Sequence, residues 1–131
     1  MARILVVEDY PVAQRLMRHQ LGRGGHDVTL AGDGLAGLRA LRAALEEDKP
    51  FQLAIVDVSM PDMDGLTMLE QLRQEPRLAG LAVIMLTASF LDEDRARAAA
   101  AGAFAFLGKP TASAELLATI EEALQAPSDH A

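Results

Sequence analysis

Short apolar runs alternate with amphipathic helical patterns along this chain, and that alternation restricts its fold more than any other feature. Residues 4–7, 53–56 and 81–86 are unbroken apolar runs, which fit parallel strands buried on both faces. Residues 26–31 alternate polar and apolar side chains as an edge strand can, and residues 103–107 form a fifth run. The pattern therefore predicts five strands.

Helical periods fill the intervals between these runs. Apolar residues recur at helical spacing in four intervals, and the remaining one, residues 92–101, is alanine-rich and favours a helix despite its weak apolar stripe. Strands that alternate with helices form a single parallel sheet with helices on both sides, and right-handed crossovers leave few topologies. The four stripes are Val12, Leu16, Met17 and Leu21; Leu35, Leu38, Leu41 and Leu45; Leu66, Leu69 and Leu72; and Leu116, Leu117, Ile120 and Leu124.

The length and the cysteine content restrict the class of protein. A chain of 131 residues fits one domain, expected here over residues 1–125 with a C-terminal tail at residues 126–131. It has no cysteine, which excludes disulfides and thiolate metal sites and favours a reducing cytoplasm. No charged-then-apolar leader opens it and no apolar run could span a bilayer, so we expect a cytoplasmic protein that does not bind membranes.

Acidic residues outnumber basic ones in this chain. The 19 Asp and Glu residues against 12 Lys and Arg residues give a formal net charge of -7 at pH 7. This balance argues against direct nucleic-acid binding, because such surfaces are basic. It leaves open both an acidic cluster that binds a divalent cation and a general role of the charge in solubility.

Polar side chains follow the predicted strands at the points where they end. In open parallel sheets, function gathers at the carboxyl ends of the strands, so these side chains are expected to meet on one rim. Three carboxylates, a hydroxyl and an ammonium are among them. They belong to Glu8 and Asp9 after the first strand, Asp57 at the end of the third, Thr87 and Ala88 at the end of the fourth, and Lys109 after the fifth.

The three carboxylates predict a site for a hard cation. Clustered carboxylates repel one another, and without a counter-charge at least one tends to keep its proton. Oxygen ligands suit Mg²⁺, which often takes one or two carboxylates together with a phosphate. Glu8 or Asp9 taken singly is as well explained as a helix cap, but helix capping does not explain the whole group.

Asp57 is a candidate nucleophile, metal ligand or helix cap. A carboxylate can attack phosphorus and hold the phosphoryl group as an aspartyl phosphate. Such a transfer needs positioning and charge neutralisation more than proton chemistry. Lys109 would neutralise a phosphoryl oxygen, and the Thr87 hydroxyl would donate a hydrogen bond to another. Taken singly, Lys109 fits a solvated surface lysine and Thr87 an ordinary strand residue.

Four segments, in this order and spacing, resemble the motifs of response-regulator receiver domains. They match the opening strand with its acidic pair, the phosphoacceptor loop, the switch threonine and the lysine segment of that family. The resemblance covers roughly residues 3–125. The four segments are Ile4-Leu5-Val6-Val7-Glu8-Asp9, Val56-Asp57-Val58-Ser59-Met60-Pro61-Asp62-Met63-Asp64-Gly65, Leu86-Thr87-Ala88 and Leu107-Gly108-Lys109-Pro110.

The resemblance implies both a fold and an activity. The fold would be a doubly wound, flavodoxin-like parallel sheet with strand order 2-1-3-4-5, five helices and three layers. The activity would be that of a signalling switch, not a classical enzyme, because such a domain catalyses only its own phosphoryl transfer and dephosphorylation. Asp57 would accept the phosphoryl group from a histidine kinase or a histidine phosphotransfer protein, with Mg²⁺ as cofactor.

The resemblance also assigns roles around the metal and the phosphoryl group. Asp9 and Asp57 would bind Mg²⁺ directly, Glu8 largely through water, and Ser59 through its backbone carbonyl. Three groups would bind the phosphoryl oxygens, and the peptide after the lysine is typically cis in the family. Those three groups are the Thr87 hydroxyl, the Ala88 amide and the Lys109 ammonium.

Phe106 stands at the position of the family's switch aromatic. The phosphoryl group would draw Thr87 inward, and an aromatic at Phe106 would fill the vacated space. The surface made by the fourth helix, the fifth strand and the fifth helix would then change shape for a partner. The phosphoryl group can shift the domain between its two conformations only if it makes different contacts in each of them. Simple core packing is the alternative role for Phe106.

Several positions depart from the family pattern or are unspecified by it. Phe106 lacks the hydroxyl of the tyrosine often found there. Phe104 stands where family members often have a polar residue, and it fits either an apolar surface for a partner or ordinary packing. Residues 10–14 resemble the same segment of receivers attached to hybrid sensor kinases. Ser59 and Ser89 occupy positions that tune phosphate lifetime in the family.

Three competing functions fit the residues less well. A phosphatase of the haloacid dehalogenase type needs a second aspartate two residues after the first, where this chain has Ser59. A flavodoxin-like cofactor binder needs a phosphate-cradling loop after the first strand, where Glu8 and Asp9 would repel phosphate. A degenerate receiver that acts only by docking normally lacks an acidic residue, Thr87 or Lys109, and none is missing here.

The output of the chain is less determined than its acceptor. No output domain follows residue 125, so we expect either a free-standing protein that docks to a target or one piece of a hybrid sensor kinase or larger regulator. In the second case it would serve mainly as a docking or phosphorelay module. A phosphorylation-dependent homodimer is a further possibility, while the kinase, its signal and the downstream target cannot be read from the residues.

Overall fold

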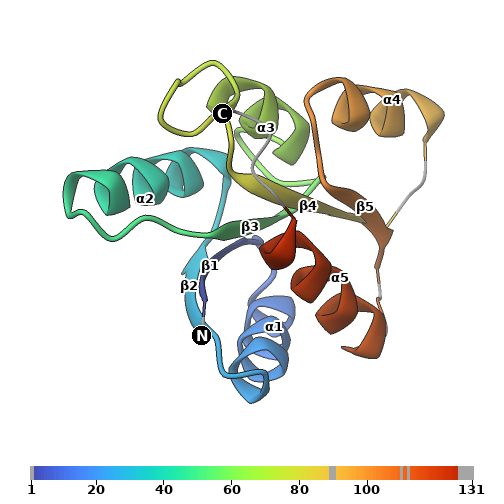
Figure 1. Ribbon diagram of the computed structural model, residues 1–131. Coiled ribbons are helices and arrows are strands. Elements are labelled where there is room, and N and C mark those ends of the chain that lie inside the picture. The colour runs from blue at the N-terminus through green and yellow to red at the C-terminus, as the bar shows by residue number, and fades with distance from the viewer. Residues whose placement is uncertain (1, 89–90, 110, 112, 127–131) are drawn as a thin grey trace.

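The computed structural model describes residues 2–88, 91–109, 111 and 113–126. Strands and helices alternate along the chain, as the hydrophobic pattern predicts (Figure 1). The elements are β1 (Arg3–Val7), α1 (Pro11–Arg23), β2 (Asp27–Ala31), α2 (Gly34–Glu46), β3 (Leu53–Asp57), α3 (Gly65–Leu72), β4 (Ala82–Thr87), α4 (Asp92–Ala100), β5 (Ala105–Gly108) and α5 (Ser113–Gln125).

The five strands form one parallel sheet in the order β2-β1-β3-β4-β5, which confirms the predicted fold class. Strand β3 is buried along its whole length, as its unbroken apolar run predicts for a central strand. In the register, Asp57 pairs with Leu86 and Thr87 pairs with Gly108. The strands therefore bring the candidate residues to the same edge of the sheet.

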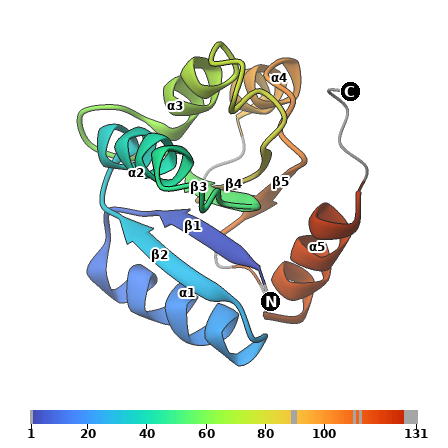
Figure 2. The same ribbon diagram turned by 60° about the vertical axis from the view of Figure 1, so that its left-hand side comes forward.

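Helices cover both faces of the sheet and give the molecule three layers (Figures 1 and 2). Helices α2, α3 and α4 lie over one face, where Leu38, Met68 and Ala98 contribute to a shared apolar core. Helices α1 and α5 lie over the other face, where Leu21 and Ile120 pack in a second core. The amphipathic stripes read from the sequence thus bury α2 and α3 on one side and α1 and α5 on the other.

All five strands differ from their expected bounds by one or two residues, and β4 and β5 differ at both ends. Strand β4 begins after Leu81, whose carbonyl accepts a hydrogen bond from Arg73, and it extends to Thr87. Strand β5 begins at Ala105, although the amide of Phe104 already donates to Val83. A side chain from another loop and a single bridging hydrogen bond thus decide boundaries that apolar runs alone leave open.

Glycine at position 65 lets the chain turn closely around the end of β3. A Cβ atom on Gly65 would lie 2.1 Å from the Asp57 carbonyl oxygen, a separation that no side chain tolerates. The Gly65 amide donates to the Val58 carbonyl at 2.9 Å, and the Val58 amide donates to Leu86 at 2.8 Å. The backbone that follows Asp57 is therefore tied to β4 and to the start of α3.

Some expectations concern residues that the structure does not describe or test. Ser89, the Lys109–Pro110 peptide and the tail from residue 127 lie outside the described residues. The domain boundary at residue 125 stays a prediction. Across the described residues, no helix has both the length and the apolar content required to traverse a bilayer.

Candidate functional site

The predicted site residues of three strands meet at one end of the sheet. Lys109, which follows β5, places its Nζ 2.5 Å from Oε1 of Glu8 and 3.3 Å from Oδ2 of Asp57. Glu8 follows β1 and Asp57 is the last residue of β3. Their side chains are only 4% and 8% exposed, so water screens these contacts poorly. The lysine thus links two carboxylates that are far apart in the sequence.

Backbone and side-chain contacts hold Glu8 in place. The amide of Tyr10 donates to Oε2 of Glu8 at 3.1 Å, and Nε2 of Gln14 donates to the Glu8 carbonyl at 2.6 Å. Gln14 belongs to α1, so the first turns of that helix fix the acidic end of β1. Gln14 was not among the predicted site residues, and its polar side chain between the apolar positions of α1 is the signal that could have identified it.

Asp9 completes a group of three carboxylates. One oxygen from each of Glu8, Asp9 and Asp57 lies within 4.8 Å of the others. Glu8 and Asp57 are buried whereas Asp9 is exposed, so the group opens to solvent on the side of Asp9. The three carboxylates therefore lie together, as predicted from their positions at the carboxyl ends of the strands.

The electrostatics of Asp57 reflect this crowding. Burial and the charge of Glu8 raise the pKa of Asp57 from 3.8 to about 6, while Lys109 opposes the rise. Burial acts on Glu8 in the same direction, but hydrogen bonds from Lys109 and the Tyr10 amide outweigh it and lower the pKa of Glu8. Burial works against the charge of Lys109 as well, and the two carboxylates overcome it and raise the pKa of Lys109.

The donor set fits a hard divalent cation. Glu8 and Asp57 share Lys109, Asp9 adds a third carboxylate to the group, and burial raises the pKa of Asp57. Glu8, Asp9 and Asp57 offer the oxygen ligands that Mg²⁺ prefers, and no nitrogen or sulfur ligand is needed. Ser59, predicted to bind through its carbonyl, lies exposed two residues after Asp57.

Thr87 and Lys109 are joined through the backbone beside this group. The Lys109 amide donates to the Thr87 carbonyl at 2.7 Å, and the Thr87 side chain is buried as the last residue of β4. Ala88 follows directly and is exposed. Phe106 is half-buried and packs against the core beneath α4. All the residues predicted to bind the phosphoryl group therefore lie at the carboxyl ends of β3, β4 and β5.

An apolar groove opens next to this site, between α1 and the start of α5. It has a volume of about 340 Å³ and reaches from Glu8 and Lys109 to Leu116. Two apolar residues of its α1 wall, Val12 and Leu16, are more than half exposed. Both belong to the apolar stripe predicted for this helix, but the stripe is wider than the core, and only its inner residues Met17 and Leu21 are buried.

Comparisons with known proteins agree with this geometry. The chain is 35% identical, over 95% of its length, to the DNA-binding dual master transcriptional regulator RpaA of Synechocystis sp., and covers 50% of that protein. It is 38% identical over 93% of its length to the transcriptional regulatory protein GltR of Pseudomonas aeruginosa, of which it covers 48%. The chain thus spans about half the length of these curated relatives.

Solved structures of receiver proteins resemble this chain as well. The chemotaxis protein CheY4 of Vibrio cholerae superimposes with a TM-score of 0.86 at 30% identity, over 95% of this chain and 99% of that one. A CheY-like receiver domain protein of Methanospirillum hungatei matches with a TM-score of 0.84 at 31% identity, over 95% and 94% of the two chains. The family model described as the response regulator receiver domain matches residues 4–121. The chain therefore belongs to the response regulator receiver domain family of two-component signalling.

Proposed function

We propose that the chain is a phosphorylation-dependent signalling switch that accepts a phosphoryl group on Asp57. The observation that carries the proposal is the position of Asp57, buried at the end of β3 with Lys109 Nζ 3.3 Å away and two further carboxylates beside it. Phosphoryl transfer needs a positioned oxygen nucleophile and neutralisation of the phosphoryl charge, and this group of residues offers both.

The transfer would form one bond and break one. A carboxylate oxygen of Asp57 attacks the phosphorus, and the bond from phosphorus to the donor atom breaks. The electron pair of that bond leaves with the donor, which is a phosphohistidine nitrogen of a histidine kinase or of a histidine phosphotransfer protein, and the imidazole is released neutral after taking up a proton. Lys109 neutralises a phosphoryl oxygen, and the Thr87 hydroxyl and Ala88 amide donate to others.

Glu8, Asp9 and Asp57 would hold Mg²⁺, with the Ser59 carbonyl as a further ligand. When bound, the ion would supply positive charge that offsets the carboxylates and the phosphoryl oxygens. Release of Lys109 from its present contact with Glu8 would let it turn to the phosphoryl group, since its Nζ already lies within reach of both carboxylates.

The protein donor would dock in the groove between α1 and α5. The groove leads from exposed Val12 and Leu16 to Lys109, so an occupant with an apolar ridge could bring its phosphohistidine to Asp57. Helix α1 carries three arginines and no acidic residue, although the whole chain has a net charge of -7. An acidic flank beside the apolar ridge of the donor would complement this helix.

The switch would pass from Thr87 to Phe106 and on to the surface of α4, β5 and α5. Buried Thr87 lies beside the acceptor, and Phe106 lies on the neighbouring strand under α4. A downstream protein, or a second copy of the chain, would read the changed surface. Because curated relatives are about twice as long, a role as the receiver module of a larger regulator or hybrid kinase is the second candidate.

The test is the intact mass of the protein after incubation with Mg²⁺ and acetyl phosphate. We expect one added phosphoryl group, which Asp57→Asn abolishes. Asp62→Asn is the matched control, because Asp62 is an exposed aspartate of the same loop at φ 66°, a backbone conformation that asparagine tolerates. Absence of an adduct together with absence of Mg²⁺ binding would contradict the proposal. An adduct that persists in Asp57→Asn would move the acceptor to another residue.

A further inference from the structure

Helix α4 is held by side-chain contacts more than by burial. Ala98 is its one buried residue, and Leu91 at its N-cap is 49% exposed. By comparison, α2 buries five residues along 13 positions. Burial of a single alanine gives little hydrophobic stabilisation, so the position of α4 depends on the contacts that its ends make with the rest of the domain.

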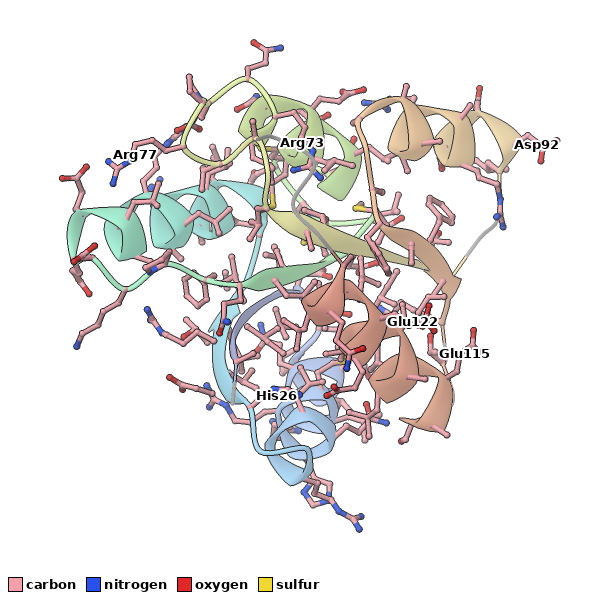
Figure 3. The ribbon with its side chains drawn as sticks, viewed as in Figure 1. His26, Arg73, Arg77, Asp92, Glu115 and Glu122 are labelled. Carbon is pink, nitrogen blue, oxygen red and sulfur yellow. The ribbon has the colours of Figure 1, made fainter. Side chains whose placement is uncertain are left out.

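The C-terminal end of α4 is tied to α3. The guanidinium of Arg73, just after α3, reaches the loop that follows α4 and the loop that precedes β4, and Figure 3 labels it there. Arg97, in the second half of α4, pairs with Glu70 of α3 at 2.7 Å. Arg73 donates to four carbonyls: Ala79 at 3.0 Å, Leu81 at 2.7 Å, Ala101 at 2.7 Å and Gly102 at 2.9 Å.

The first turn of α4 makes a different contact. Cζ of Arg95 lies 5.3 Å from the centre of the Phe106 ring, within the range of a cation–π interaction. Phe106 belongs to β5 and packs against the core that includes Ala98. Arg95 therefore covers the aromatic that the proposed switch moves. In Figure 3, Asp92 marks the outer end of α4, away from Arg73.

We propose that Arg95 is a positioning residue that couples Phe106 to the first turn of α4, so that this turn moves outward about the fixed C-terminal end of the helix when the ring leaves the guanidinium. Phe106 has no hydroxyl and cannot bind α4 through a side-chain hydrogen bond of its own. A cation over its face is a contact that an aromatic ring permits, and that contact is lost when the ring turns inward. The idea that phosphorylation triggers the movement rests on the proposed function. The coupling of Phe106 to the first turn of α4 through Arg95 does not.

Amide hydrogen exchange measured by NMR tests the coupling in the complete chain. The amides of Asp94 and Arg95 donate to Leu91 in the first turn, and the Ala101 amide donates to Arg97 at the other end. In Arg95→Gln we expect the first-turn amides to exchange roughly two- to five-fold faster, the range that an exposed cation–π contact supports. The Ala101 amide should keep its wild-type rate, and Arg95→Lys should fall between Arg95→Gln and wild type.

Two further variants separate coupling from general loosening. Arg97→Gln removes the same charge from the same helix and should speed exchange at Ala101 instead. In a Phe106→Leu background, Arg95→Gln should accelerate exchange at the first turn less than it does in the wild-type background, since the ring is already gone. Equal acceleration at both ends of α4, or undiminished acceleration in the Phe106→Leu background, would overturn the proposal, as would an Arg95→Gln variant with wild-type exchange.

Acetyl phosphate with Mg²⁺ tests the trigger. Phosphorylated protein should show the first-turn acceleration of Arg95→Gln, and Asp57→Asn should not. Phosphorylation at Asp57 with unchanged first-turn exchange would overturn the trigger while leaving the proposed acceptor intact. If no adduct forms, the proposed function fails and the coupling is decided by the Arg95 variants alone.

Discussion

The acceptor end of β1 and β3 and the side of the domain that carries α4 are built in opposite ways. At the acceptor end, Glu8 and Asp57 are buried, and Lys109 lies 2.5 Å and 3.3 Å from them. On the α4 side, an exposed ion pair, one buried alanine and an arginine over an aromatic ring hold the helix. The proposed switch needs both properties, because its chemistry requires fixed groups while its output requires an element that changes position at low energy.

The largest effect is expected from Lys109→Met. The variant keeps much of the side-chain length but leaves Glu8 and Asp57 buried without their shared cation. Removal of one partner from a buried ion pair costs up to ~3–5 kcal/mol, and the partial exposure of Lys109 places the expected loss near ~2 kcal/mol at pH 7. Labelling by acetyl phosphate should fall by ~10²-fold, because a fixed charge at the phosphoryl oxygens is lost.

Urea unfolding and the rate of adduct formation measure these two effects. The stability loss should shrink as the pH falls, because the pKa of Asp57 is already raised and loses the opposing effect of Lys109, so Asp57 takes up a proton and one of the two uncompensated charges disappears. Lys49→Met is the control for loss of a surface lysine, since Lys49 is exposed and far along the chain from the site. Equal losses in both variants would show that the acceptor end is not the tightly held region described above.

A stability effect of similar size and opposite sign is expected from Asp57→Asn. The pKa of Asp57 is raised in the folded state, so between pH 4 and pH 6 the folded protein binds more protons than the unfolded chain. Stability therefore falls as pH rises through this window, and at pH 7 the ionised Asp57 destabilises the fold. Asparagine removes that charge, and we expect a gain of ~1–3 kcal/mol at pH 7 without Mg²⁺ that vanishes near pH 4.

Urea titrations of both proteins from pH 4 to pH 8 check this prediction. Millimolar Mg²⁺ should reduce the difference at pH 7, because bound cation stabilises the wild-type site and has one ligand fewer in the variant. A variant that is less stable than wild type at pH 7 would show that Lys109 outweighs both burial and Glu8. Ionised Asp57 would then not destabilise the fold.

Much of this arrangement could be predicted from the sequence. Parallel strands bring their carboxyl ends together, so Glu8, Asp57 and Lys109 follow from the ends of apolar runs. The contacts of α4 could not be predicted in the same way. Arg73 donates to carbonyls of two loops that carry no side-chain signal, and no sequence pattern indicates that Arg95 of α4 lies over the Phe106 ring of β5.

Exposed Val12 and Leu16 illustrate a second limit. Helical spacing identifies apolar residues on one side of α1, but it cannot tell which of them a neighbouring element covers. Met17 and Leu21 meet the sheet, while α5 lies far enough away to leave a groove over the other two. The partner proposed to cover them is another protein, so no property of these residues alone distinguishes a docking surface from a core.

The smallest effect is expected at the Arg97–Glu70 pair, which links α3 and α4. Its two side chains are 43% and 42% exposed, so solvent screens the 2.7 Å contact that raises the pKa of Arg97 and lowers that of Glu70. Such surface pairs contribute about 0.5 kcal/mol, less in high salt. A double-mutant cycle with Arg97→Gln and Glu70→Gln, read by urea unfolding at low and high NaCl, should return a coupling energy of that size. A coupling energy as large as the loss in Lys109→Met would mean that α4 is held as tightly as Glu8 and Asp57. A helix held so tightly could not be the element that moves in the proposed switch.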